Sequence, residues 1–420
     1  MTDKQNQQLF HEVVSPFCGL ACDDLTIKVE KQHITVVENG DKYSQRGFET
    51  PLIDTAPRVN GQQVSLDTAV DHCQQLIENS QQTVISGLAT DVNGSRSALS
   101  LADKCGASID HMNAKGLLSN TLVLQDTGWM VTTLSEVKNR VDLLVVVGSD
   151  ISHSYPRFFD RVIWPDHTLF SSSVSNRKIV YLGAEPAVSS SSDAISVIPC
   201  QPNDLPEVMA ILRALINHKP IQAEKVGGVA IAALEQLAEA LLSSQYSVIT
   251  WAAGEWQGQH NELTIQTLCE MIKDVNRTTR CSGLPLAGKE GDITVNQVAA
   301  WQTGYPIRTS FQRGFPDYDP YLYDSQRMLD NNEVDTLIWV SSFDTDRKPP
   351  QSQANTIVLG RAGMTFEREP EVFIPVGTPG IDHSGHIFRS DSVVALPLKQ
   401  LRKSCLPSVS DVLSAIEATL

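Results

Sequence analysis

Short stretches near the N-terminus alternate between apolar and polar residues. Leu25–Glu30 and His33–Glu38 have this period of two, and Asn39-Gly40-Asp41 follows them as a turn signal. Such alternation predicts strands that bury one face. We therefore expect a small β-rich module over residues 1–55.

From residue 66 onward, compact apolar runs alternate with segments of helical periodicity. The apolar runs, typical of strands covered on both faces, are residues 83–85, 141–147, 178–182, 246–252, 334–340, 356–359 and 372–376. Apolar residues at helical spacing occupy residues 66–78, 93–105, 204–218, 230–242, 262–275 and 408–419. This alternation predicts an α/β fold with parallel, Rossmann-like sheets.

The chain length predicts more than one domain. A chain of 420 residues is typical of two or three domains, each with its own core. We expect the β-rich module to be followed by an α/β domain formed from residues 56–140 and 316–420. A second α/β domain, residues 141–315, is expected to be inserted into the first.

The charge and the apolar content exclude several classes of partner. The formal net charge of -16 disfavours nucleic acid and anionic membrane surfaces as partners. The sequence has no apolar run near the ~20 residues that span a bilayer, and its first ten residues lack the apolar core of a secretory signal. We therefore expect a cytoplasmic protein without disulfides.

Cysteine usage singles out one pair. Of the eight cysteines, Cys18 and Cys22 alone are close in the sequence. The other six are scattered and are expected to be buried, unreactive thiols: Cys73, Cys105, Cys200, Cys269, Cys281 and Cys405.

Glycine-containing loops follow several predicted strands. Open parallel sheets bind ligands beyond the carboxyl ends of their strands, so these loops are candidates for a cofactor cleft. An acid such as Glu185 is suited to accept a hydrogen bond from a ribose or a guanine. The alternative is that each glycine only ends its strand and permits the turn. The candidate residues are Gly148, Ser149, Asp150, Glu185, Gly254, Glu255 and, in the 301–306 segment, Gly304.

Two histidine-containing segments resemble catalytic or metal sites. His153 with Asp150 is a conceivable base and its orienting acid, but a turn held by Asp150 and an ion pair of Arg157 is the interpretation we favour. His383 and His386 lie in a glycine-containing loop rather than on a rigid helix, which favours an exposed loop over a metal site.

Aromatic and arginine side chains indicate a surface for protein partners. These residue types are enriched at the centres of protein interfaces. The candidates for partner contact are Tyr305, Arg308, Arg313 and Trp339.

An ordered set of short motifs resembles one family. The first is Ser15-Pro16-Phe17-Cys18-Gly19-Leu20-Ala21-Cys22-Asp23-Asp24, which would read Cys-x2-Cys-x3-Cys with a cysteine at position 15. Further motifs are residues 135–142, 152–157, 301–306, 313–316, 375–382 and 388–391. In this order, and over nearly the whole chain, they resemble the B subunit of formylmethanofuran dehydrogenases. The resemblance implies the molybdopterin oxidoreductase (formate dehydrogenase-like) fold.

The chain departs from that family at the iron–sulfur motif. A [4Fe–4S] cluster normally takes four thiolates. Position 15 is serine, and residues 39–47, where the fourth thiolate is expected, contain no cysteine. No histidine is spaced to complete a zinc site. Cys18 and Cys22 are therefore interpreted as remnants of a cluster motif, and we expect no bound metal there.

A second departure concerns the catalytic metal. Redox-active relatives place a cysteine or selenocysteine in the segment that corresponds to residues 115–121, and this segment has no thiol. A molybdenum or tungsten centre would then lose its soft protein ligand. Ligation by the alkoxide of Ser119 is the alternative. No cofactor is expected, and the cleft candidates are interpreted as vestigial.

The resemblance implies a role within a larger assembly. One branch of the family belongs to a formyltransferase/hydrolase complex of methylotrophic one-carbon metabolism, which passes formyl groups from tetrahydromethanopterin to a methanofuran-type carrier and releases formate. There, an amidohydrolase-like A subunit and a formyltransferase D subunit carry the chemistry, and B packs against A and C. We expect a non-redox structural B subunit without catalytic residues of its own. The alternatives are an active molybdenum or tungsten pterin-dependent dehydrogenase subunit and a nucleotide- or carrier-binding accessory subunit.

Overall fold

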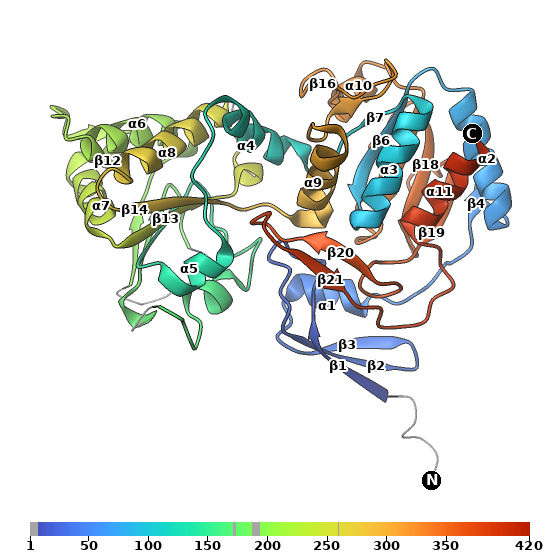
Figure 1. Cartoon of the computed structure of the whole chain (residues 1–420), viewed down its shortest axis with the longest axis horizontal. Coiled ribbons are helices and arrows are strands. Elements are labelled where there is room, and N and C mark those ends of the chain that lie inside the picture. Colours follow the sequence, from blue (N-terminus) through green and yellow to red (C-terminus); the bar gives the residue numbers. More distant parts are fainter. Residues whose placement is uncertain (1–6, 171–173, 187–193, 259) are drawn as a thin grey trace, which may run out of the picture. The chain divides into compact units, whose positions relative to one another are not determined.

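A computed structural model describes residues 7–170, 174–186, 194–258 and 260–420 of the chain (Figure 1). The chain divides into two compact units. Unit 1 comprises the residues up to Ala114 together with Gly288–Leu420, and unit 2 comprises Lys115–Ala287. The sequence pattern predicted these changes at residues 140 and 315, later in the chain. At the first boundary, the difference arises because helix α4 (Ala114–Asp126), which has apolar residues on several sides, gives no periodic signal.

The N-terminal strands form a small antiparallel sheet in unit 1. Its order is β1 (Gln7–Val13), β2 (Leu25–Glu30) and β3 (His33–Glu38). Helix α1 (Lys42–Glu49) follows, and Asp41 caps it by accepting hydrogen bonds from the backbone N–H groups of Tyr43 and Ser44. Val14 and Ala21 share a hydrophobic cluster with Ala89 and Phe343, so this module packs against the main sheet of unit 1.

The main sheet of unit 1 has the order β16-β15-β7-β6-β17-β18-β19-β4-β5. Its central strands β7 (Ser108–Ile109), β6 (Thr83–Ala89), β17 (Thr336–Ser341), β18 (Asn355–Arg361) and β19 (Val372–Val376) pair in parallel. The edges pair antiparallel, through β15 (Thr309–Ser310), β16 (Asp317–Tyr318), β4 (Arg58–Val59) and β5 (Gln62–Gln63). A separate hairpin joins β20 (Gly385–Phe388) to β21 (Ala395–Leu398).

Helices pack against this sheet in unit 1. They are α2 (Leu66–Glu78), α3 (Val92–Cys105), α9 (Asp292–Thr303), α10 (Ser325–Asp330) and α11 (Val409–Thr419). Figure 1 shows α3 and α11 side by side, and Ser97 of α3 meets Ser410 of α11 with their hydroxyl oxygens 2.8 Å apart.

Unit 2 is built on a parallel sheet with the order β10-β9-β8-β13-β14. These strands are β8 (Leu143–Val147), β9 (Lys178–Leu182), β10 (Ile195–Ile198), β13 (Tyr246–Trp251) and β14 (Arg280–Pro285). The helices are α4, α5 (Leu134–Arg140), α6 (Leu205–Ile216), α7 (Ile231–Ser243) and α8 (Asn261–Val275), and a short hairpin pairs β11 (Lys225–Val226) with β12 (Val229–Ala230). The core joins the strands to helices α6, α7 and α8, for example through Val147, Leu212, Leu234 and Leu268.

The strand order of unit 2 reverses between β8 and β13. From β8 the chain proceeds to β9 and β10 on one side, and then to β13 and β14 on the other. Ligands of open α/β sheets bind at such a switch point, beyond the carboxyl ends of the strands. In this unit those ends lead into Gly148 and Gly254.

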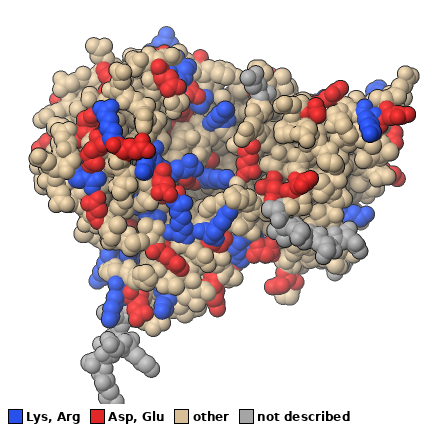
Figure 2. All heavy atoms as spheres, turned by 180° about the vertical axis from the view of Figure 1, so that it is seen from behind, with Lys and Arg blue, Asp and Glu red and all other residues tan. Residues whose placement is uncertain are grey.

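The predicted α/β class with parallel sheets is confirmed. The runs at 178–182 and 372–376 are strands with the predicted bounds, because apolar side chains there are buried on both faces. Acidic and basic side chains are interspersed over the face drawn in Figure 2. In the part of the chain that is described, no helix combines the length and apolar character needed to cross a membrane.

Candidate functional site

The loop between β1 and β2 brings three motif positions together. The backbone N–H of Ser15 donates to the carbonyl of Cys22 at 2.8 Å, and that of Ala21 donates to the carbonyl of Cys18 at 2.8 Å. Ser15, Cys18 and Cys22 are all buried. Burial raises the pKa of the Cys18 thiol well above its ordinary value, and the neighbouring Cys22 raises it further. Cys18 is therefore a neutral thiol rather than a thiolate.

The stretch that follows the hairpin places oxygen atoms near this loop. Asp41 is buried, and its charge also raises the pKa of Cys18. Asp41 Oδ1 accepts from the backbone N–H groups of Tyr43 and Ser44, each at 2.8 Å. The hydroxyl of Ser44 donates to the backbone carbonyl of Asp41 at 2.9 Å. These oxygen atoms are thus engaged in the cap of α1.

Residues 115–121 form the first turns of helix α4 in unit 2. Leu117 is buried, and Asn120 Oδ1 accepts a hydrogen bond from the indole N–H of Trp251 at 2.9 Å. Gly116 lies so close to the loop after β13 that a Cβ on it would be 2.7 Å from the Cα of Gly254. The backbone of α4 therefore covers the end of β13.

The switch point of unit 2 gathers several cleft candidates. Gly148 has a φ of 75°, and a Cβ on it would lie 2.6 Å from Trp256 Nε1, so the indole occupies the space above the end of β8. The hydroxyl of Ser154 donates to the Glu255 carboxylate, which connects the loop after β8 to the loop after β13. Trp256 and the Ser154–Glu255 hydrogen bond therefore lie at the ends of β8 and β13.

The remaining cleft candidates have individual roles. Asp150 accepts from the backbone N–H of Ser152 at 3.0 Å and from its hydroxyl at 2.6 Å, which is a turn-capping arrangement. Ser149 Oγ is buried with no hydrogen-bond partner among the described residues. Glu185 is exposed just after β9. Gly304 belongs to unit 1, where its φ of 83° ends helix α9.

The first histidine segment is a turn, whereas in the second segment His386 lies in strand β20, so the predicted loop over His383 and His386 is wrong for His386. Arg157 Nε lies 3.2 Å from Asp160 Oδ2, which agrees with the turn interpretation. Asp382 Oδ1 pairs with Arg402 Nε at 2.7 Å, and both side chains are buried. His383 Nδ1 lies 2.9 Å from the carbonyl of Ser384. Asp382 thus anchors its loop through Arg402.

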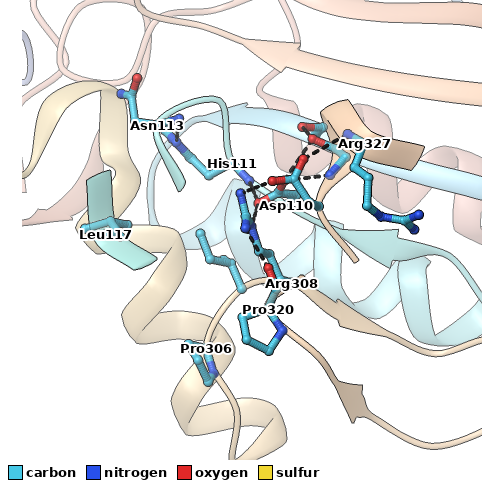
Figure 3. A network of polar contacts seen from close by, with 12 residues as sticks. Asp110, His111, Asn113, Leu117, Pro306, Arg308, Pro320 and Arg327 are labelled. Carbon is cyan, nitrogen blue, oxygen red and sulfur yellow. Dashed lines mark hydrogen bonds and ion pairs between the residues drawn. The ribbon is translucent and has the colours of Figure 1, made fainter. Parts of the chain in front are cut away.

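A buried polar network in unit 1 was not predicted from the sequence (Figure 3). Asp110, directly after β7, accepts from the backbone N–H and the hydroxyl of Ser325, each at 2.9 Å. Arg308 Nε lies 3.3 Å from Asp110 Oδ1, and Arg308 Nη2 lies 2.5 Å from Asp324 Oδ2. No local motif marks these residues, because 198 positions separate Asp110 from Arg308.

His111 extends this network as a neutral imidazole. Its Nδ1 accepts from the backbone N–H of Asn113 at 2.9 Å, so the ring proton lies on Nε2, 3.1 Å from the carbonyl of Glu290. Burial lowers the pKa of His111 to about 4. Both ring nitrogens are engaged within the chain, so His111 has a structural role.

A buried carboxyl group lies at the start of α9. Asp292 Oδ1 accepts from the backbone N–H of Ile293 at 2.5 Å. Burial raises the pKa of Asp292 to about 7, and the charge of Glu290 adds to this effect. Asp292 therefore holds a proton through most of the acidic range.

Two of the residues predicted to contact partners are buried within the chain. Arg308 is 5% exposed and is engaged in the network above. Trp339 is 6% exposed, and its indole N–H donates to the carbonyl of Arg347 at 2.8 Å. The prediction was wrong for both, because residue type alone does not distinguish a buried anchor from an interface residue. Tyr305 and Arg313 are exposed.

Comparison with known proteins gives a consistent result. No family model matches the chain. The B subunit of the tungsten-containing formylmethanofuran dehydrogenase 2 of Methanococcus maripaludis is 24% identical over 421 residues, covering 96% of each chain. The B subunit of the formyltransferase/hydrolase complex Fhc of Methylorubrum extorquens is 28% identical over 341 residues, covering 79% of this chain and 87% of the relative.

Solved structures support the same assignment. A chain of the formyltransferase/hydrolase complex FhcABCD from Methylorubrum extorquens, solved with methylofuran, superimposes with a TM-score of 0.75 at 25% identity, covering 87% of this chain and 98% of the other. Over most of its length, this chain is similar to the B subunits of formylmethanofuran dehydrogenases and of the formyltransferase/hydrolase complex. Acetylene hydratase from Pelobacter acetylenicus shares the fold, with a TM-score of 0.65 at 10% identity over 97% of this chain and 69% of that chain.

The cysteine loop of this chain does not fit a [4Fe–4S] cluster. Such a cluster normally needs four thiolates, whereas this loop offers Cys18 and Cys22 with a serine at position 15. Among the described residues, no group of three or more His, Cys, Asp or Glu side chains is arranged to hold a metal ion. The loop therefore supplies two of the four thiols that such a cluster needs.

Residues 115–121, the segment that the resemblance implies for a metal ligand, do not fit a tungsten or molybdenum centre either. Residues 115–121 contain no sulfur atom, and soft metals in such centres need a soft ligand. Leu117 and Asn120 are packed in the interior of unit 2. Ligation by Ser119 stays an untested hypothesis.

Proposed function

We propose that the chain is the non-redox B subunit of a formyltransferase/hydrolase complex. In this proposal, formyl groups pass from tetrahydromethanopterin to a methanofuran-type carrier and are released as formate by sister subunits. An amidohydrolase-like A subunit and a formyltransferase D subunit carry the chemistry, while this chain and the C subunit support the assembly. We expect the complex to lie in the cytoplasm.

The donor set of the cysteine loop carries the proposal. Cys18 is a buried neutral thiol, and the position that completes the motif is Ser15. An electron-transferring B subunit needs a cluster to pass electrons to or from its active metal. This loop offers only two thiols, and the nearby oxygen atoms are already hydrogen-bonded in the cap of α1. It is therefore unsuited to hold a cluster that transfers electrons.

The switch point of unit 2 gives a second, independent support. A dinucleotide cofactor needs open space at the strand ends and backbone N–H groups that point into it. Here the indole of Trp256 lies over Gly148, and Gly116 lies close to Gly254. The hydroxyl of Ser154 donates a hydrogen bond to Glu255. Opening this crevice would require the loops to separate.

An active dehydrogenase subunit is the second candidate function. One observation favours it: the relative that is similar over 96% of both chains is a tungsten-containing formylmethanofuran dehydrogenase subunit. This candidate requires iron together with tungsten or molybdenum in proportion to the chain. The donor residues described above argue against it.

Elemental analysis of the purified native complex tests the proposal. We expect iron, molybdenum and tungsten well below one atom per copy of this chain. Iron near four atoms per copy, together with tungsten or molybdenum near one, would overturn the proposal in favour of the dehydrogenase.

A variant series tests the cysteine loop directly. The double variant Cys18→Ala/Cys22→Ala should assemble and release formate within about twofold of the wild-type rate, because no cluster is lost. Cys73→Ala is the matched control, since Cys73 is a buried thiol of helix α2 in the same unit. If both variants assemble but only the double variant loses activity, the cysteine pair holds a required group and the proposal fails.

A further inference from the structure

A groove of about 720 Å³ lies along the seam between helices α3 and α11 in unit 1. Serines of both helices line it, as does Thr303 at the end of α9. Phe311 and Pro316 of the following loop line it as well. The groove shares no residue with the cysteine loop or with the switch point of unit 2, and nothing in the proposed function uses it.

Serine hydroxyls bonded to each other form a polar floor. Ser97 Oγ lies 2.8 Å from Ser410 Oγ and 3.3 Å from Ser414 Oγ. Ser100 Oγ donates to Glu417 Oε1 at 2.7 Å. The residue numbers of the paired positions increase in the same direction along both helices, so α3 and α11 run parallel. Small side chains let the two helices approach closely and leave room above the seam.

The groove carries opposite charges at its two ends. Arg96 and Asp103, both exposed on α3, line it. Within the described part of the chain, neither side chain has an ion pair or hydrogen bond. Seven residues of helix correspond to about 10 Å. Glu417, at the C-terminal end of α11, adds a second carboxylate near the end marked by Asp103.

Exposed aromatic rings adjoin the lining residues in the chain. Trp301 and Phe315 are each 53% exposed and directly precede Gln302 and Pro316, which line the groove. The nearby Arg313 pairs with Asp317 at 3.2 Å, so this loop contributes a charge that is already compensated. Aromatic side chains are enriched at protein interfaces, where their large apolar area is covered.

We propose that this groove binds an extended segment of a sister subunit. The proposal rests on the proposed function, in which the chain works inside a hetero-oligomeric complex. An acidic residue of the segment pairs with Arg96, and a basic residue pairs with Asp103 and Glu417. Because an extended chain rises about 3.3 Å per residue, the two charges of the segment are about three residues apart. An apolar side chain between or beside them packs against Phe311 and Pro316, which line the groove.

Photo-crosslinking in the assembled complex identifies the occupant. With p-benzoylphenylalanine in place of Gln302, we expect a cross-link to one sister subunit, in a segment with an acidic and a basic residue about three positions apart. A cross-link to a second copy of this chain, or no cross-link in a fully assembled complex, overturns the proposal.

Charge reversal measures the contribution of the groove to assembly. Arg96→Glu and Asp103→Lys should each weaken binding to the sister subunits by about three- to tenfold, measured as a dissociation constant in a dilution series. Lys104→Glu is the control, because Lys104 is exposed beside Asp103 on the same helix but does not line the groove.

The outcomes separate this proposal from the proposed function. If the complex assembles and all three variants bind as tightly as the wild type, the groove is not the docking site while the subunit role stands. If the wild-type chain itself fails to assemble with the sister subunits, the proposed function fails, and this proposal fails with it.

Discussion

Arg308 Nε lies 3.3 Å from Asp110 Oδ1, and both side chains are buried in unit 1. Arg308 Nη1 also donates to the carbonyl of Pro320 at 2.6 Å. The guanidinium therefore joins the end of β7 to two segments that lie roughly two hundred residues further along the chain. Burying both charges costs desolvation, and the network offsets this cost only when all its partners are present.

Removing Arg308 should strongly destabilise unit 1. Arg308→Ala leaves Asp110 buried without its counter-charge, and we expect a loss of about 3–5 kcal/mol in the free energy of unfolding. Denaturant unfolding followed by tryptophan fluorescence measures it. Arg313→Ala, which removes an exposed arginine from the same loop, should change stability by about 0.5 kcal/mol or less. Equal losses for the two variants would contradict the role assigned to Arg308.

Asp292 should make stability depend on pH. Burial raises its pKa in the folded chain to about 7, above the value of 3.8 expected when unfolded. The stability that its protonated form contributes is complete below about pH 3.8 and is lost as the pH rises through 7. An asparagine at this position cannot ionise. The free energy of unfolding of Asp292→Asn, relative to that of wild type, should therefore rise by about 2 kcal/mol from pH 5.5 to pH 8.5.

Thermal melting at these two pH values measures the difference. Asp71→Asn is the control, because Asp71 is exposed on helix α2 and its substitution should give the same difference at both pH values. A pH-independent effect of Asp292→Asn would mean that Asp292 is ionised in the folded chain.

Gly148 and Gly128 provide a matched pair of substitutions in unit 2. Both have positive φ, but a Cβ at Gly148 meets Trp256 whereas a Cβ at Gly128 meets no atom within 4 Å. Gly128→Ala should cost about 1 kcal/mol, from backbone strain alone. Gly148→Ala should cost about 1–3 kcal/mol more, because the indole must move. If the two variants unfold at the same denaturant concentration, Trp256 does not fill the switch point.

Thiol labelling tests the burial of the cysteine loop. Cys405 is exposed, so the expectation that it is buried was wrong. In the folded chain, iodoacetamide should modify Cys405 first, while Cys18 reacts only after denaturation because it is buried and its pKa is raised. Mass spectrometry of peptides from a time course measures the order. Labelling of Cys18 as fast as Cys405 would show that the loop opens readily.

The sequence was most informative where local pattern decides structure. The apolar runs at 178–182 and 372–376 predicted strands with the observed bounds, since both faces of these strands are covered. Helix α4 was missed because its apolar residues do not share one face: Leu117 and Val123 are buried while Leu124 is exposed. Period alone does not reveal a helix of this kind.

The candidate sites show the same contrast between features that local sequence reveals and features that it does not. The sequence alone shows that position 15 and residues 115–121 lack a thiol, because the residue type decides whether a sulfur atom is present. The filling of the switch point by Trp256 depends on how a loop folds back over Gly148, which no local spacing encodes. The Asp110–Arg308 network likewise depends on contacts between residues that lie 198 positions apart in the sequence.

The insertion of unit 2 between Ala114 and Gly288 has a consequence for how the protein is made. Strand β6 pairs with β17, and Ala89 bonds to Ser342, which lies 253 residues later. At a synthesis rate of ~5–20 residues per second, the ribosome needs roughly ten to thirty-five seconds to add unit 2 alone. During that time β6 lacks its partner strand β17, so its backbone edge is unpaired and its apolar side chains are uncovered. The nascent chain therefore depends on chaperones or on rapid folding of unit 2 to avoid aggregation.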